Sequence, residues 1–516
     1  MAWWTNGVLY QIYPRSFADA NGDGIGDLAG VVERLDYVAA LGVDGIWLNP
    51  VTVSPNADWG YDVADFCAVD PSLGTLDDLD ALVVAASDRG LRVLLDLVPN
   101  HTSAEHPWFV ESRSSRENPK RDWYVWAEGA AGGGPPNNWL STFGGPAWEL
   151  DPTTGQHYLH NFLREQPDLN WWNPEVREEF ERILRFWFDR GVAGFRIDVA
   201  HMLVVDAELR DNPAATEADN WLDRLRGQVQ RYNANQPEVH ELYRRWREVA
   251  ESYDPPRLLL GETFVVDVPD VVSFYGADDE LHLAFDIPFT LAPFDPDALR
   301  KVVEETELLM PPGCTPCYTL GNHDVNRFAS RWCGGDPAKI RLALTVFFGL
   351  RGTLVLYYGD ELGLPDTAIP RERRLDPLGR DAERTPMPWA DAPDAGFSTA
   401  GVEPWLPIGD LAVNVAAQAD DASSVLALTR DLVRLRASSS ELRDGAYETL
   451  AASDGLWAWR RGDHAVVAAN FGDSEARLEP VEGRIAIGTD RTRDGEPVDG
   501  TLTLASCEAA IMMRSS

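Results

Sequence analysis

The chain has 516 residues, of which 44% are hydrophobic, enough to bury the cores of two or three globular domains. Its 83 acidic residues outnumber the 45 basic residues and give a formal net charge of −38. A surface of that sign repels polyanions, so nucleic acids and anionic membranes are excluded as expected partners.

The five cysteines do not make a disulfide framework, and Cys314 and Cys317 have no second CxxC to complete a zinc site. The amino terminus lacks a basic segment followed by an apolar run, and no window of 18 apolar residues occurs. We therefore expect a cytoplasmic protein without a membrane span, either a monomer or a homodimer.

Eight short apolar runs, most of them too continuously apolar for half-exposed strands, follow one another along the chain. They are Val8–Ile12, Gly45–Leu48, Leu91–Val98, Ala193–Val199, Leu258–Thr263, Leu281–Asp286, Cys317–Gly321 and Thr353–Tyr358. The amphipathic segments typical of helices include Leu28–Leu41, Leu76–Arg89, Pro174–Arg190 and Ala422–Arg436. This alternation predicts an α/β fold, a closed (β/α)8 barrel. No glycine-rich dinucleotide fingerprint follows the first strand, and no organic cofactor is expected.

Two connections are too long for ordinary loops. Residues 101–170, with Gly-Gly-Gly-Pro-Pro and several tryptophans, predict an inserted subdomain after the third strand, and Pro365–Leu411 forms a long loop after the eighth. Four later runs predict the strands of a small β-sandwich, namely Leu456–Arg460, His464–Asn470, Arg484–Ile487 and Thr501–Ala505. The predicted domains are a barrel of residues 1–100 and 171–438, an inserted subdomain of residues 101–170, and a C-terminal antiparallel sandwich of residues 439–516.

The fourth predicted strand ends in Gly-Phe-Arg-Ile-Asp-Val at residues 194–199. Residues two apart share a face of a strand, so Arg196 and Asp198 should both point into the barrel. The neighbouring guanidinium should lower the pKa of Asp198 and keep it ionised, as a nucleophile requires. A structural Arg–Asp pair inside the barrel is the alternative.

The fifth predicted strand ends in Gly261-Glu262-Thr263. Carboxylates at the ends of adjacent strands can flank one bond, and a separation of about 5 Å gives a covalent intermediate with retention, whereas a wider gap gives inversion. Glu262 is the expected acid, its pKa raised by apolar neighbours and by the charge of Asp198. A buried, hydrogen-bonded glutamate is the structural alternative.

Two further strands lead into polar clusters. Asn322-His323-Asp324 follows the seventh strand, where a third carboxylate could bind sugar hydroxyls and favour an oxocarbenium-like transition state. The third strand supplies Asp96 and His101 at the same rim. Four such clusters at the carboxyl ends of barrel strands point to a sugar-cleaving site.

In this order, residues 96–101, 194–201, 261–264 and 322–324 resemble the four signature regions of the α-amylase superfamily. Gln166-Pro-Asp-Leu-Asn170 is similar to the fifth region in its oligo-1,6-glucosidase and α-glucosidase branch. The likeness covers nearly the whole chain. It implies that Asp198 is the nucleophile, Glu262 the acid/base and Asp324 the transition-state stabiliser.

The resemblance also implies a closed sugar pocket. Tyr61 matches a stacking platform and Asp62 a hydroxyl binder, while Arg384, in Glu-Arg-Thr-Pro-Met-Pro-Trp, resembles the arginine that pairs with that aspartate. If the pair forms, only one glucose fits beyond the cut bond, and the enzyme removes single glucose units from non-reducing ends. The remaining residues expected to contact the substrate are His101, Phe143, Arg196 and His323.

Linkage preference is the least determined property. Val199 tends to accompany action on α-1,6 bonds in this branch, whereas the following Ala200-His201 looks more like bacterial α-glucosidases of broader reach. We expect activity on maltose-like α-1,4 sugars, with an oligo-1,6-glucosidase as the alternative. A transglucosidase or sucrose isomerase would share the same glucosyl-enzyme. A binding protein without catalysis is disfavoured because all three carboxylates are present.

A candidate metal loop lies near the amino terminus. Its oxygen ligands alternate along Asp19-Ala-Asn21-Gly-Asp23-Gly-Ile25-Gly-Asp27, matching the first nine positions of an EF-hand loop. The twelfth position is glycine instead of glutamate, and the loop resembles the calcium site of the oligo-1,6-glucosidase branch. We expect a structural Ca2+, with Mg2+ as the alternative. A glycine-rich turn without metal would show the same pattern.

Overall fold

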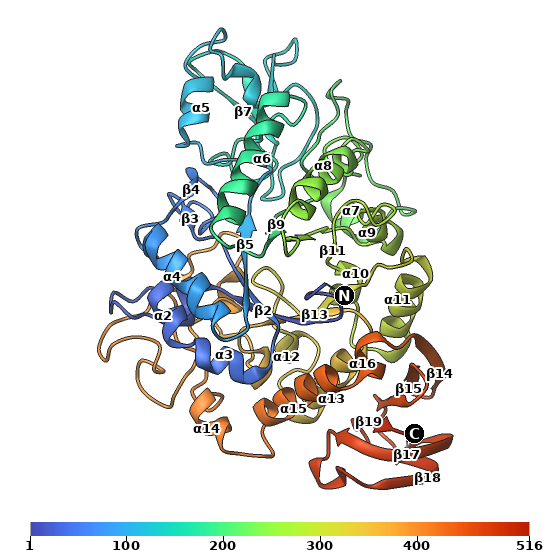
Figure 1. The fold of residues 1–516 in the computed structure, drawn as a ribbon. Helices are drawn as coiled ribbons and strands as arrows, with labels where there is room; N and C mark the ends of the chain where they lie inside the picture. The colour runs from blue at the N-terminus through green and yellow to red at the C-terminus, as the bar shows by residue number, and fades with distance from the viewer. Residues whose placement is uncertain (1, 515–516) are drawn as a thin grey trace. The chain divides into compact units, whose positions relative to one another are not determined.

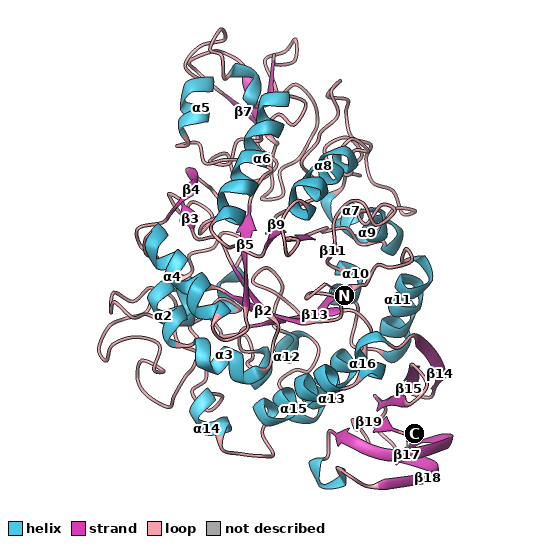
Figure 2. Cartoon of the chain, viewed as in Figure 1, coloured by secondary structure: helices cyan, strands magenta, loops and turns pink. Residues whose placement is uncertain are grey.

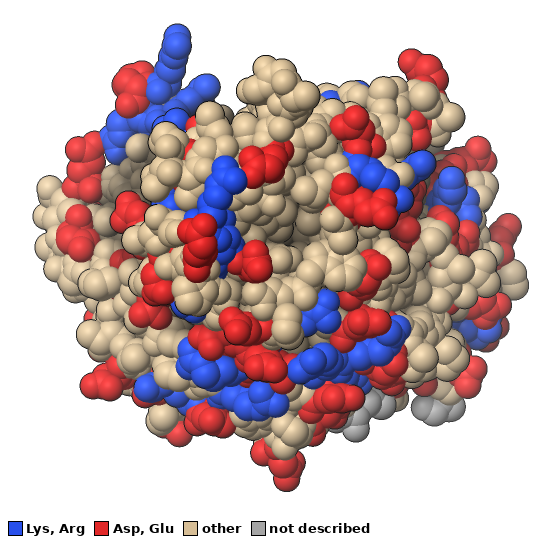
Figure 3. Space-filling view, turned by 90° about the horizontal axis from the view of Figure 1, so that it is seen from above, with Lys and Arg blue, Asp and Glu red and all other residues tan. Residues whose placement is uncertain are grey.

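The computed structural model describes residues 2–514, which divide into two compact units. Unit 1 comprises Met1–Ile46, Val84–Arg92 and Asp286–Ser516, and unit 2 comprises Trp47–Val83 and Val93–Phe285. Among residues 2–514, the structure contains no helix with the length and apolarity that crossing a bilayer requires. On the face drawn in Figure 3, acidic and basic side chains are interspersed, and no broad basic patch gathers there.

A parallel eight-stranded sheet forms the centre of the fold (Figure 1). Its strands are β1 (Val8–Ile12), β2 (Gly45–Leu48), β5 (Arg92–Leu97), β9 (Gly194–Ile197), β10 (Leu258–Gly261), β11 (Leu283–Ala284), β12 (Cys317–Thr319) and β13 (Thr353–Tyr357). Neighbours in the sheet follow chain order, and β1 pairs in parallel with β13, which joins the first strand to the last as a barrel requires. The predicted (β/α)8 fold is confirmed, and all eight predicted strands occur.

The predicted β11 is longer than the observed one for a local reason. The His282 N–H keeps a backbone bond to the Leu259 carbonyl of β10 at 3.1 Å, but the Leu259 N–H donates to His282 Nδ1, also at 3.1 Å, instead of to a carbonyl. At the other end, Asp286 caps the next helix, α10 (Ile287–Leu291), by accepting from the Phe289 N–H. The regular strand is thereby confined to two residues.

The helices of unit 1 begin with α1 (Pro14–Phe17), α2 (Leu28–Glu33) and α3 (Leu35–Leu41) and continue after α10 with α11 (Pro296–Leu309), α12 (Phe328–Arg331), α13 (Pro337–Gly349), α14 (Val415–Ala419), α15 (Val425–Ser438) and α16 (Ser440–Asp444). The single helix predicted over Leu28–Leu41 is wrong, because Arg34 has φ −104° and ψ 2° and divides it. The Arg34 guanidinium lies 4.4 Å from the Trp389 ring and donates to the Gly396 carbonyl. These tertiary contacts at the break are absent from the helical pattern.

Unit 2 contains the strand pair β3 (Thr52–Val53) and β4 (Asp65–Val69), and the helices α5 (Pro107–Ser112), α6 (Pro174–Asp189), α7 (Trp221–Arg226), α8 (Val239–Glu251) and α9 (Val268–Ser273). α4 (Leu76–Ser87) spans the division between the units. Local signals explain the start of α6, where the Asn173 side chain accepts from the Glu175 N–H and Pro174 occupies the first turn. Phe180 and Trp187 belong to its buried apolar stripe.

Residues 101–170 contain few regular elements, as Figure 2 shows by the prevalence of loop around α5. They hold the turn η1 (Arg121–Trp123) and a three-stranded antiparallel sheet of β6 (Trp126–Ala127), β8 (His157–Leu159) and β7 (Trp148–Leu150), in that order. Trp139 and Trp148 are buried together with Leu159 in a small core. Several of the tryptophans of this segment thus serve packing.

The C-terminal strands form one antiparallel sheet, and the predicted antiparallel C-terminal architecture is confirmed. Its strands are β14 (Tyr447–Ser453), β15 (Leu456–Arg461), β16 (Ala465–Asn470), β19 (Ala509–Met513), β17 (Ala476–Gly488) and β18 (Pro497–Leu504), in sheet order, with a turn η5 (Arg491–Arg493). Register shifts at 478/481 and 485/487 interrupt β17, and five of the strands share one apolar core. Bulges of this kind bend a strand, which allows the sheet to fold over that core.

Candidate active site

One buried arginine binds three carboxylates in unit 2. Arg196 Nη1 lies 2.8 Å from Asp96 Oδ1 and 2.7 Å from Asp198 Oδ1, and its Nη2 lies 2.6 Å from Glu262 Oε1. The Arg196 side chain is fully buried, and its guanidinium lies 5.1 Å from the Trp47 ring. The structure therefore brings the predicted nucleophile and the predicted acid to adjacent nitrogens of one cation.

Strand register produces this cluster. In the parallel ladder Arg196 is the partner of Asp96 on β5 and of Leu260 on β10, so Glu262 comes two residues after the paired position. Asp198 follows the end of β9 by one residue and lies on the same face as Arg196. Adjacent parallel strands end at one edge, which places all three carboxylates around the guanidinium.

The backbone after the nucleophile is also fixed to Glu262. Val199 has φ +36°, a left-handed conformation that is rare for a β-branched residue, and its N–H donates to Glu262 Oε2 at 3.1 Å. The Ala200 N–H donates to the Glu262 carbonyl at 2.8 Å. Strain at Val199 is thus compensated by bonds that fix the segment after Asp198 relative to the Glu262 carboxylate.

Burial is the largest influence on the pKa values of the cluster, and the crowding of carboxylates adds to it. Burial raises the pKa of Asp198 well above its ordinary value, and the charges of Glu262 and Asp96 add to this against the opposing effect of Arg196. Burial likewise raises the pKa of Asp96 to about 7. The prediction that Arg196 holds the pKa of Asp198 low is wrong in its balance, because one cation does not offset burial and two further carboxylates.

Tyr61, Asp62 and His101 form a second layer in unit 2. The Tyr61 hydroxyl donates to Asp96 Oδ2 at 2.9 Å, and the Tyr61 carbonyl lies 3.1 Å from His101 Nε2. Burial lowers the pKa of His101 to about 4, so its ring is neutral. The fully buried Asp62 carboxylate accepts from the Ser54 hydroxyl at 2.7 Å and from two backbone N–H groups.

Phe143 is linked to this layer by a chain of edge and tilted ring contacts. Its ring centroid lies 6.4 Å from that of Phe162, which lies 5.1 Å from the His101 ring. Its contact with sugar stays a prediction. Gln166, in the region that resembles the fifth signature, has its Nε2 3.0 Å from His101 Nε2 and donates to Asp58 Oδ2 at 3.1 Å.

The remaining predicted residues lie together in unit 1. Asp324 Oδ1 accepts from Arg384 Nη2 and from Arg380 Nη1, each at 2.8 Å, and Asp324 Oδ2 lies 3.1 Å from His323 Nε2. Arg384 also donates to the His323 carbonyl at 2.7 Å. Arg384 is only 1% exposed, which excludes a surface salt bridge, and its pairing with Asp62 stays a prediction.

Sequence reasoning missed Arg380 and its partner Asp376. Arg380 Nη2 lies 2.6 Å from Asp376 Oδ1, and the spacing of Asp376, Arg380 and Arg384 by four residues was an available signal. Burial opposes the charge of Arg384, but nearby groups that include Asp324 and Asp376 keep its pKa raised. Asp324 is therefore held by two arginines and a histidine.

The loop of residues 19–27 is ordered largely by its own side chains. Asp19 accepts from the backbone N–H groups of Gly22 and Gly24, each at 2.7 Å, and Asp27 accepts from the Gly30 N–H as the cap of α2. Burial raises the pKa of Asp27, and the charge of Asp19 adds to it, so the two carboxylates are near each other. The donors are hard oxygens, which fit Ca2+ in kind. Within residues 2–514, however, no three His, Cys, Asp or Glu side chains converge as metal ligands.

A pair of carboxylates at the carboxyl ends of parallel barrel strands, here held by one arginine, is typical of the active site of a glycoside hydrolase. The model of the α-amylase catalytic domain matches residues 11–445. A probable α-glucosidase of Rhizobium meliloti is 43% identical over 93% of both chains, and an oligo-1,6-glucosidase of Heyndrickxia coagulans is 36% identical over 92% of this chain and 93% of its own. The chain belongs to the α-amylase family of glycoside hydrolases.

Solved structures agree with this assignment. An α-glucosyl transfer enzyme superimposes with a TM-score of 0.92 at 40% identity, covering 99% of this chain and all of its own. The predicted fold and the predicted enzyme class are thereby confirmed.

Proposed function

We propose that the protein is an exo-acting retaining α-glucosidase in which Asp198 is the nucleophile and Glu262 the acid/base. The observation that carries the proposal is the shared Arg196 guanidinium, which binds Asp198 at 2.7 Å and Glu262 at 2.6 Å through adjacent nitrogens. Two carboxylates bound to one guanidinium lie on the same side of the site, which fits the separation of about 5 Å in retaining enzymes better than the wider gap of inverting ones. This arrangement supports retention.

In the first step Asp198 attacks the anomeric carbon of a terminal glucose, while Glu262 gives its proton to the glycosidic oxygen. The bond from that carbon to the leaving oxygen breaks, and a glucosyl ester of Asp198 forms. In the second step Glu262, now a carboxylate, takes a proton from water, whose oxygen displaces Asp198. Arg196 keeps both carboxylates in place, and α-glucose leaves with the starting configuration.

By its resemblance to the family motif, Asp324 stabilises the oxocarbenium-like transition state. Its two arginine partners support this role, because they hold one oxygen and leave the carboxylate 23% exposed. Neutral His101 suits hydrogen bonding to sugar hydroxyls better than it suits charge stabilisation. Tyr61, Asp62, Phe143, His323 and Arg384 complete the proposed sugar contacts.

We propose maltose and short malto-oligosaccharides as substrates, because the α-glucosidase relative is more similar, at 43% identity, than the oligo-1,6-glucosidase relative, at 36%. The alternative of a transglucosidase is supported by the likeness to an α-glucosyl transfer enzyme. That reaction differs only in its second step, where a sugar hydroxyl replaces water.

A structural Ca2+ at residues 19–27 and a cytoplasmic location belong to the same proposal. Asp19, Asn21, Asp23, the Ile25 carbonyl and Asp27 would hold the ion. Its charge would offset the close approach of Asp19 and Asp27. No catalytic step requires it.

Hydrolysis of p-nitrophenyl α-glucoside tests the assignment. The wild type should release nitrophenol, and Asp198→Asn should lose at least about 1000-fold in kcat, because an amide cannot form the ester. Glu262→Gln should slow the hydrolysis of maltose far more than that of the nitrophenyl substrate, because the nitrophenyl leaving group needs less protonation. Equal rates for the wild type and Asp198→Asn would contradict the proposal. Parallel product analysis on maltose, isomaltose and sucrose separates the alternatives.

A further inference from the structure

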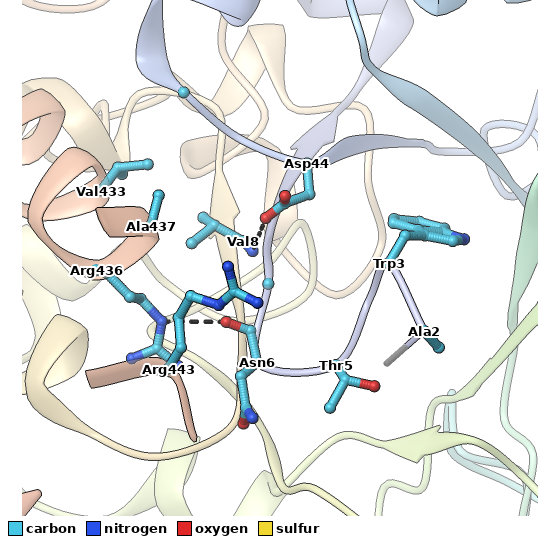
Figure 4. Close-up of a pocket in the computed structure, with 12 residues that line it drawn as sticks. Ala2, Trp3, Thr5, Asn6, Val8, Asp44, Val433, Arg436, Ala437 and Arg443 are labelled. Carbon is cyan, nitrogen blue, oxygen red and sulfur yellow. Dashed lines mark hydrogen bonds between the residues drawn. The ribbon is translucent and has the colours of Figure 1, made fainter. Parts of the chain in front are cut away.

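A cavity of about 240 Å3 lies in unit 1 among the amino-terminal segment, the turn before β2, and helices α15 and α16 (Figure 4). Trp3 and Asp44 line it from the first two elements, and Arg436 and Arg443 line it from the helices. Asp44 precedes β2 by one residue, at the amino end of a barrel strand. None of these residues belongs to the predicted catalytic or metal sets.

The charge of this cavity differs from that of the chain as a whole. Arg436 is 1% exposed and donates only to main-chain carbonyls, at Asn6, Phe348, Leu350 and Gly352. Within residues 2–514, no carboxylate forms an ion pair with Arg436 or with Arg443. Burial lowers the pKa of Arg436 well below its ordinary value, and the nearby charges of Arg461 and Arg443 lower it further. The cavity therefore contains two cations without a direct ion pair, which Asp44 and Asp444 offset only at longer range.

Arg443 is placed to meet a ligand directly. Its side chain is exposed, and Figure 4 shows it extending across the cavity toward Asp44. One Asp44 oxygen accepts from the Val8 N–H at 2.8 Å, which leaves the other for a ligand hydroxyl. Arg92 does not line the cavity but is a third cation close to it, since it acts electrostatically on Asp44 and lies 5.4 Å from the Trp3 ring. Asp444 is a second acid within electrostatic range of Arg436.

Trp3 gives the cavity an apolar wall. Its indole is half-buried, with its edge against Gly45, and offers a flat surface of the kind that packs on the apolar face of a sugar ring. The planar guanidinium of Arg443 has the donor geometry that binds phosphate oxygens in pairs. A cavity of this volume suits a ligand smaller than the drug-sized molecules that occupy about 300–1,000 Å3.

We propose that this cavity binds a small phosphorylated sugar. Arg443 holds the phosphate, the buried charge of Arg436 attracts it, Asp44 accepts from a hydroxyl, and Trp3 packs on the ring. The bound molecule would link the amino-terminal segment to α15 and α16 and so stabilise unit 1. The proposed site uses no residue of the proposed chemistry, and it stands whether or not the α-glucosidase assignment holds.

Isothermal titration of the full-length enzyme with glucose 6-phosphate, inorganic phosphate and glucose tests the site. Arg443→Gln should weaken the affinity for glucose 6-phosphate at least about 10-fold, because the substitution removes a charged hydrogen-bonding partner. Arg434→Gln is the matched control, since Arg434 is also an exposed arginine, on α15, and forms an ion pair with Asp431. The control should bind like the wild type, and both variants should hydrolyse nitrophenyl glucoside normally.

The titrations with glucose and with inorganic phosphate distinguish the contribution of the sugar from that of the phosphate. Glucose should bind equally to the wild type and Arg443→Gln, because any glucose bound as product does not touch Arg443. Inorganic phosphate should bind more weakly than glucose 6-phosphate. Absence of glucose 6-phosphate binding at millimolar concentration, or binding that Arg443→Gln leaves unchanged, would overturn the site. Equal affinity for phosphate and glucose 6-phosphate would overturn the role of Trp3 and the sugar.

Discussion

Arg196 Nη2 lies 2.6 Å from Glu262 Oε1, so the predicted acid/base and the predicted nucleophile share one cation. Asp96 binds the same guanidinium, which leaves three carboxylates around a single positive charge. Ionising all three carboxylates at once is energetically unfavourable, because like charges in a buried space repel one another strongly. The cluster is therefore expected to retain a proton, which in the proposed mechanism Glu262 gives to the leaving group.

The Asp96→Asn substitution tests this sharing of charge. The negative charge of Asp96 is one cause of the raised pKa of Asp198, so its removal should lower that pKa. The acidic limb of kcat/KM, where the nucleophile must be ionised, should then move by roughly one unit to lower pH. Exposed Asp88→Asn is the control and should leave the limb in place. A limb that stays in place in Asp96→Asn would show that the two charges are not coupled, and a limb that moves to higher pH would contradict the predicted sign.

Glu383 offers a test by stability. Burial, with added effects of Asp366 and Asp324, raises the pKa of Glu383 to about 8, against an ordinary value of 4.5. The folded protein thus binds this proton more tightly than the unfolded chain, so the stabilisation is complete below about pH 4.5 and is lost as the pH rises to about 8.

Glu383→Gln should therefore gain stability relative to the wild type between pH 5 and 8, by on the order of 2–4 kcal/mol at the upper end. Urea unfolding at pH 5 and pH 8 measures the difference. A constant difference between the two proteins across this range would show that Glu383 ionises normally.

Arg380 and Arg384 should both matter for turnover. Each donates to Asp324 Oδ1 at 2.8 Å, and loss of a hydrogen bond to a charged group costs about 1.5–3 kcal/mol. Arg380→Gln and Arg384→Gln should each lower kcat/KM on maltose by roughly 10-fold or more. Arg371 is an exposed arginine of the same long loop, and Arg371→Gln should leave kcat/KM on maltose unchanged. If Arg380→Gln had wild-type kinetics, this would show that Arg380 is not needed to hold Asp324 for turnover.

The loop of residues 19–27 predicts a response to calcium. Protein treated with a chelator should melt at a lower temperature, and added Ca2+ should restore it by mass action. Asp23→Ala should abolish the restoration without removing the α2 cap, which Asp27 provides. A melting temperature that chelator and Ca2+ leave unchanged would identify the loop as a turn ordered by its own hydrogen bonds.

Much of the barrel was predictable because its strands are buried on both faces and read as continuous apolar runs. β1 and β2 begin and end at the predicted residues, and β9 is shorter only by its flanking positions. The errors occur where tertiary contacts decide local structure. Arg34 breaks a helix while it contacts Trp389, and the His282 ring accepts the Leu259 N–H that a backbone carbonyl would otherwise accept beside β11. Neither contact leaves a periodic signal in the sequence.

The pairing of Arg196 with Asp198 was predictable from strand alternation alone, whereas the sign of its effect was not. That sign depends on burial and on Asp96 and Glu262, which come from other strands. Arg380 was missed although its spacing of four residues from Asp376 and from Arg384 was visible, because the long loop around it has no hydrophobic pattern that indicates a fixed structure. The C-terminal prediction lacked β14 and β19, because β14 has no fully buried residue and β19 is a short apolar run close to the chain end.

The central claim is that Asp198 becomes glucosylated during turnover. A 5-fluoro-α-glucosyl fluoride forms that ester quickly and releases it slowly, so the intermediate accumulates and its peptide can be sequenced by mass spectrometry. The account predicts that the added mass of one fluoroglucosyl group lies on Asp198 in the peptide that contains Arg196. Label on another residue, or turnover with no labelled protein at any time, would contradict it.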